Sequence, residues 1–99
     1  MQFVKNRVYV VTCPDLFEGP TLAFEPHYIF DGARSILWND GERDHLTGAS
    51  EVIHEDEQSI TVRSGNFVWT FMEMTMELWQ ELRPKIIGGD DLHFKRVEE

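Results

Sequence analysis

The stretch SITVRSGNFVWTFMEMTMELWQELRP, residues 59–84, changes its hydrophobic period partway along and so decides between strand and helix. Its first half alternates apolar and polar residues around Gly65-Asn66, a pair suited to a two-residue hairpin turn. A turn there sets Val62 opposite Trp69. This single register sorts both strands into one apolar and one more polar face, as a half-buried hairpin requires. The apolar face collects Ile60, Val62, Phe67, Trp69 and Phe71.

The second half of the stretch has the period of a helix. Thr75 is a suitable N-cap, and Pro84 cannot continue a helix, so the pattern predicts a short helix over 75–83. A competing start at Thr70 has capping-box spacing, but the hairpin register favours the later start. The apolar stripe of this helix consists of Leu78, Trp79 and Leu82.

Upstream, turn signals separate short runs rich in β-branched and aromatic residues. Two-residue turns are expected at Asp31-Gly32 and Asp40-Gly41, and an acidic loop at 55–58. The predicted strands outside the hairpin are 3–12, 28–30, 34–39, 42–45, 50–54 and 92–97.

These elements predict one α+β domain over residues 1–99. Its sheet is expected to be an antiparallel meander of about five to seven short strands. The pattern does not decide whether this sheet curls into a barrel-like form. The short helix near 75–83 follows the hairpin, and 92–97 forms a final edge strand. Lys95 and Arg96 would protect that edge from aggregation.

Composition narrows the class of protein. The chain of 99 residues has a single cysteine, Cys13, so an intramolecular disulfide is impossible and a cytoplasmic setting is expected. No apolar run approaches the length of a membrane helix. Cys13 has no histidine near it in sequence, which favours a buried structural thiol over a nucleophile.

Acidic residues are concentrated in one window of the chain. The net charge is −9, and the window 39–57 alone contributes −6, because it holds seven acids and the single base Arg43. Such a surface repels nucleic acid and anionic membranes and attracts basic partners. A purely solubilising surface is the alternative interpretation. The acids are Asp40, Glu42, Asp44, Glu51, Glu55, Asp56 and Glu57.

The charge pattern favours a non-catalytic protein-binding module whose acidic face contacts a basic partner surface. On a strand, Asp40, Glu42 and Asp44 would form a row with a spacing of about 6.6 Å. Such a row could imitate nucleic-acid phosphates, so an inhibitor of a nucleic-acid-handling enzyme is one form of this hypothesis. Trp38 is a candidate anchor, with a core position as the alternative. The candidate partner-binding residues are Trp38, Asp40, Glu42, Asp44, Glu55, Asp56 and Glu57.

Metal and cofactor chemistry finds little support in the sequence. Asp40, Glu42, Asp44 and Glu51 have the spacing of a helix–loop–helix calcium site, but His45 stands where that loop needs glycine. His45 and His54 match no local metal signature. No phosphate loop or serine elbow is present, so we expect no enzyme activity, no metal and no cofactor.

Two further function classes stay open. One is a structural subunit of a larger assembly that uses the final edge strand. The other is a small-ligand or enzymatic domain with a pocket between sheet and helix, lined by Trp69, Trp79 and Met74. The methionines at 72, 74 and 76 could gather as a soft partner surface or could fill gaps in the core.

Overall fold

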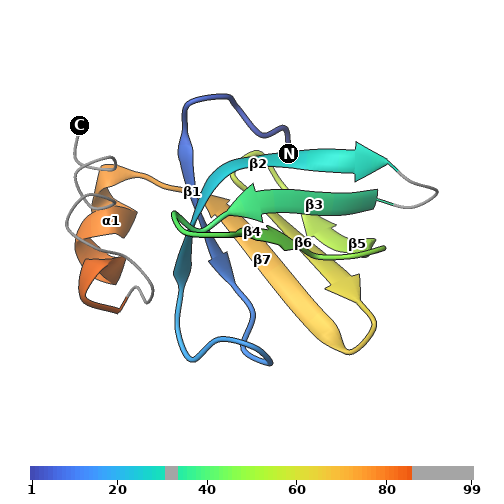
Figure 1. Cartoon of the computed structure of the whole chain (residues 1–99). Helices are drawn as coiled ribbons and strands as arrows, with labels where there is room; N and C mark the ends of the chain where they lie inside the picture. The colour runs from blue at the N-terminus through green and yellow to red at the C-terminus, as the bar shows by residue number, and fades with distance from the viewer. Residues whose placement is uncertain (31–33, 86–99) are drawn as a thin grey trace.

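The computed structural model describes residues 1–30 and 34–85, which form one antiparallel sheet of seven strands and one short helix (Figure 1). This architecture confirms the predicted α+β meander. The predicted final strand over 92–97 and the expected turn at Asp31-Gly32 lie outside the described residues. In chain order the strands are β1 (Val8–Thr12), β2 (Thr21–Phe30), β3 (Arg34–Asn39), β4 (Asp44–Leu46), β5 (Glu51–Glu55), β6 (Ser59–Ser64) and β7 (Phe67–Glu73).

The strand order β4-β3-β2-β1-β7-β6-β5 is that of an up-and-down barrel opened at one place. Strands that follow one another in sequence lie side by side, and the first strand pairs with the last. The exception is β4 and β5, which form the two edges of the sheet although only residues 47–50 join them. In Figure 1 the strands curl around a common interior, so the sheet is barrel-like without being closed.

The hairpin of β6 and β7 has the predicted register throughout. Val62 lies opposite Trp69, and Ser64 opposite Phe67, with Gly65 and Asn66 between the strands. Gly65 has a φ of 60°, a conformation that glycine adopts without steric cost. The predicted pairing of β5 with β6 is also confirmed, with a register shift between Val52 and His54.

Two strands differ from the predictions because irregular backbone interrupts them. The first strand begins at Val8 and not at residue 3, since Asn6 has a φ of 70° and the chain turns there. Strand β2 extends much farther than the predicted 28–30. Its pairing shifts between Phe24 and His27, where Glu25 has a φ of 51°, so Pro26 is accommodated in a bulge.

The core occupies the inside of the curled sheet. Adjacent residues on a strand face opposite sides, so Ala23 points inward while Leu22 and Phe24 point outward. The N-terminal segment covers one end of the interior through Phe3, whose ring contacts Tyr9 edge-on. The buried inner side chains are Tyr9, Val11, Cys13, Ala23, Ile36, Trp38, Ile60, Val62, Trp69 and Phe71.

Helix α1 (Met76–Leu82) packs on the outer face of the sheet. Thr75 is its N-cap, and its side-chain oxygen accepts a hydrogen bond from the Leu78 amide at 3.1 Å. Because β7 continues to Glu73, the later of the two predicted helix starts is correct. Trp79 anchors the helix in a second cluster with Leu22 and Phe24. A 3₁₀ turn, η1 (Arg83–Lys85), follows the helix.

The methionines divide between core and surface. Met74 packs against the cluster beneath α1, whereas Met76 is 59 % exposed. Met72 is half-buried like Met74, so Met76 is the one of these three methionines that is largely exposed. No helix within residues 1–30 and 34–85 has the length and apolar character needed to span a bilayer.

Candidate partner-binding site

The acidic window follows the two edges of the sheet. It begins in the turn after β3, continues through β4, the connection 47–50 and β5, and ends in the turn before β6. The acidic charge therefore borders the opening between β4 and β5, which the linear sequence did not indicate. All but Asp40 of its acids are exposed: Glu42, Asp44, Glu51, Glu55, Asp56 and Glu57.

Asp40 has a structural position in the turn between β3 and β4. Its Oδ1 accepts hydrogen bonds from the amides of Glu42 at 2.8 Å and Arg43 at 2.9 Å, and its Oδ2 lies 2.8 Å from His45 Nε2. Burial alone would raise the pKa of Asp40, but the hydrogen bonds from His45 and the two amides outweigh it and lower that pKa. Asp40 therefore orders the turn and positions His45.

This turn corrects the predicted row of charges. Residues 40–43 form a four-residue turn, closed by a hydrogen bond from the Asp40 amide to the Arg43 carbonyl at 3.1 Å, and β4 begins only at Asp44. The expected two-residue turn at Asp40-Gly41 is therefore wrong. Because Asp40 and Glu42 lie outside any strand, the regular spacing along one strand is wrong as well.

Several of the exposed acids form no ion pair among the described residues, although Arg43 lies between Glu42 and Asp44 in sequence and Arg63 lies opposite Glu51 in the β5–β6 register. Among the described residues no ion pair neutralises Glu42, Asp44, Glu51 or Glu57. Asp44 only accepts a hydrogen bond from the Asn39 side chain at 3.0 Å. Their charges therefore face solvent and are available to an approaching cation.

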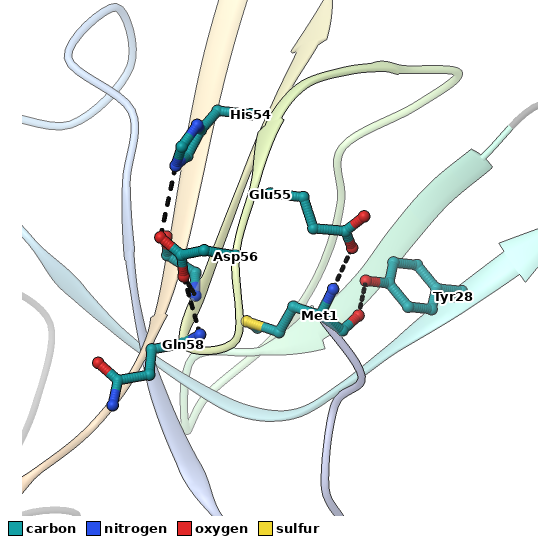
Figure 2. Close-up of polar contacts among 7 residues, drawn as sticks. Met1, Tyr28, His54, Glu55, Asp56 and Gln58 are labelled. Atoms are coloured by element: carbon teal, nitrogen blue, oxygen red, sulfur yellow. Dashed lines mark hydrogen bonds and ion pairs between the residues drawn. The ribbon is translucent and has the colours of Figure 1, made fainter.

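The turn from β5 to β6 is held by the carboxylate of Asp56 (Figure 2). Asp56 Oδ1 accepts hydrogen bonds from the amides of Gln58 and Ser59, both at 2.8 Å, and these bonds lower the pKa of Asp56. Glu55 forms an ion pair with the N-terminal amine of Met1. This ion pair partly neutralises the charge of Glu55. Glu57 forms no ion pair among the described residues, so its carboxylate is the one in this turn most accessible to a partner.

Trp38 is not accessible as an anchor for a partner. It is 1 % exposed and packs in the inner core, so its side chain cannot reach a partner in this structure. Its position follows from strand alternation, because Trp38 shares the inward face of β3 with Ile36. Trp38 therefore occupies the core position predicted as the alternative.

The two histidines of the acidic window, His45 and His54, are each paired with a neighbouring aspartate. His45 contacts Asp40, and His54 Nε2 lies 3.4 Å from Asp56 Oδ2. Within the part of the chain that the structure describes, no three side chains of His, Cys, Asp or Glu gather as metal ligands. Cys13 is buried, and burial raises the pKa of its thiol.

The residues expected to line a pocket between sheet and helix do not lie around one cavity. Trp69 belongs to the inner core, whereas Trp79 and Met74 belong to the outer cluster. These side chains lie on opposite faces of the sheet. They therefore cannot line one cavity, and the residues proposed for a ligand pocket there do not form it.

A different hollow lies beside β4, and sequence reasoning missed it. It has a volume of about 590 Å³ and lies between the loop after β1, strand β4 and the β6–β7 turn. Because three segments far apart in the chain form it, no local motif could have indicated it. We call it the β4 hollow; it is lined chiefly by Leu16, Phe17, His45, Leu46, Phe67 and Trp69.

Comparison with known proteins gives no match to a protein-family model, a curated protein or a solved structure. Evidence about function therefore comes from the charge and geometry of this chain. The two features of its surface that stand out are the acidic edges and the β4 hollow, which adjoin each other at His45 and Leu46 of β4.

Proposed function

We propose that this chain is a non-catalytic protein-binding module that presents the acidic residues of 42–57 to a basic surface on a partner protein. The proposal rests on one observation: the window runs along β4 and β5, which are the two edges of the sheet among the described residues. Acids along both edges would add to one negative field that an approaching partner meets. Such a field accelerates association with a cationic partner and disfavours anionic ones.

The proposed partner is a protein with a basic surface, such as an enzyme that handles nucleic acid. Clustered Lys and Arg residues are the electrostatic signature of that class. An acidic module seated on such a surface would compete with phosphates and act as an inhibitor. We place this interaction in the cytoplasm, because a single free thiol in Cys13 is typical of a reducing compartment. Direct binding to nucleic acid or membranes is not part of the proposal.

The test compares three versions of the chain as baits in extract from the native host. One bait is the wild type, the second carries Glu42→Gln and Asp44→Asn, and the third carries Glu77→Gln and Glu81→Gln. The third bait loses the same net charge from exposed positions on α1. Asp40 is left unchanged because its carboxylate holds the turn.

We expect a basic protein to be retained by the wild type and by the α1 control, weakly by the edge variant, and to be released by salt. Loss of retention in both variants would mean that only net charge matters. Equal retention by all three baits would reject Glu42 and Asp44 as part of the binding surface.

A further inference from the structure

Exposed apolar side chains lie together in the β4 hollow, whereas on most protein surfaces such side chains are scattered singly. Of the large hydrophobic residues that are exposed in the described chain, three line this one hollow: Leu16 at 49 %, Leu46 at 55 % and Phe67 at 39 %. They come from a loop, an edge strand and a hairpin. Single exposed apolar residues need no explanation, but a concave group of them is typical of an interaction site.

Aromatic rings packed on the inner core form the floor of the hollow. The ring of Phe17 meets that of Trp69 edge-on at 6.0 Å and that of His45 at 6.1 Å, measured between centroids. The ring of His45 stacks on that of Trp38, and its Nε2 lies 2.8 Å from Asp40 Oδ2. A floor fixed in this way loses little freedom on binding, which favours affinity.

The charge beside the hollow selects the kind of partner. Among the residues that the structure describes, those that line the hollow include no Lys, Arg, Asp or Glu, but Asp44 adjoins it along β4 and Glu42 precedes that strand. Both carboxylates are exposed and form no ion pair among the described residues, and Arg43 between them in sequence offsets only part of their charge. A second copy of this chain, with a net charge of −9, would meet like charge here.

We propose that the β4 hollow receives a large apolar side chain of the partner protein, flanked in the partner by Lys or Arg residues that contact Glu42 and Asp44. This inference rests on the proposed function and adds to it the anchor that Trp38 cannot supply. Apolar contact in the hollow slows dissociation, while the acidic edge speeds association. Hot spots of interfaces commonly combine a packed anchor with a charged rim in this manner.

The probe for this inference is a set of short peptides in which one variable position is flanked on both sides by lysines. The variable residue is Phe or Ala, and a third peptide keeps Phe but replaces the lysines with glutamines. Affinity is measured by fluorescence anisotropy, and the site is located from the indole N–H resonances of Trp69 and Trp79. We expect the Phe peptide to bind about tenfold more tightly than the Ala peptide and to shift the resonance of Trp69, leaving that of Trp79 in place.

Substitutions on two different elements keep the test independent of any one folding defect. Leu46→Gln and Phe67→Gln should each abolish the preference for Phe over Ala while the lysine-dependent binding persists. Met76→Gln is the control, because Met76 is also an exposed apolar residue, at 59 %, but lies on α1. It should bind all peptides as the wild type does.

The outcomes separate the two proposals. If the Phe and Ala peptides bind the wild type equally and in a salt-dependent manner, the hollow is not an anchor site and the acidic module stands. If the glutamine peptide binds as tightly as the lysine peptide, the basic partner is rejected, and this inference with it. If no peptide binds, or if Leu46→Gln and Phe67→Gln keep the preference, the hollow is not the site.

Discussion

Trp38 and His45 stack face to face across the pair of strands β3 and β4, with ring centroids 4.4 Å apart and an angle of 17° between the ring planes. Trp38 is buried, and His45 covers it and extends the aromatic packing to the β4 hollow. Burial of Trp38 thus removes it as an anchor but lets it support the surface that we propose as one. The stack links the core directly to the edge strand with the acidic residues.

Asp40 should stabilise the folded chain in a manner that depends on pH. Replacing Asp40 with Ala removes two amide contacts and the contact to His45, and we expect a loss of about 1–2 kcal/mol in the free energy of unfolding near neutral pH. Because the pKa of Asp40 is lowered in the folded chain, the charged form adds stability above its unfolded pKa of about 4.

That contribution is lost as the pH falls through the still lower pKa of the folded state. The difference between wild type and Asp40→Ala should therefore narrow in acid, as followed by urea unfolding at a series of pH values. If the difference in the free energy of unfolding between the two proteins stays constant down to the lowest pH of the series, the charge of Asp40 does not contribute to stability.

Substitution of Gly65 should destabilise the fold more than substitution of its neighbour in the hairpin turn. Its φ of 60° disfavours any side chain, although a methyl group there would meet no atom within 4 Å. Gly65→Ala is expected to lower the free energy of unfolding by about 1 kcal/mol through backbone conformation alone. Asn66→Ala is the control, and we expect a change within about 0.5 kcal/mol. Equal effects of both substitutions on the urea midpoint would contradict this assignment.

Thr75 should stabilise α1 through its hydroxyl group. Thr75→Ala leaves the Leu78 amide without its capping oxygen, and we expect a loss of about 1 kcal/mol in the free energy of unfolding. Thr75→Ser keeps the oxygen and should lose much less. Hydrogen exchange at the Leu78 amide reports the cap directly, and equal exchange in the Ala and Ser variants would rule it out.

Much of the fold could be predicted where local patterns and tertiary packing agree. Alternation around Gly65-Asn66 gave the whole register from Ile60 opposite Phe71 to Ser64 opposite Phe67. Thr75 and Pro84 set the limits of the helix because capping and proline geometry are local effects. Both features depend on residues close together in the chain.

The predictions failed where the backbone leaves regular geometry or where the site is nonlocal. Asn6 and Glu25 have a positive φ, which the sequence did not indicate, so β1 was predicted too long and β2 too short. Asp40 was counted as a surface charge because its contact to His45 depends on the turn. The β4 hollow depends on three distant segments, which only the fold brings together.

The most direct test is the association rate of the captured basic protein with this chain across a salt series. For Glu42→Gln with Asp44→Asn, we predict a rate roughly threefold below that of the wild type at low salt, and a difference that disappears at high salt. The α1 control, Glu77→Gln with Glu81→Gln, should follow the wild type. If the edge variant associates as fast as the wild type at every salt concentration, the acidic edges are a solvated surface and do not recognise a partner.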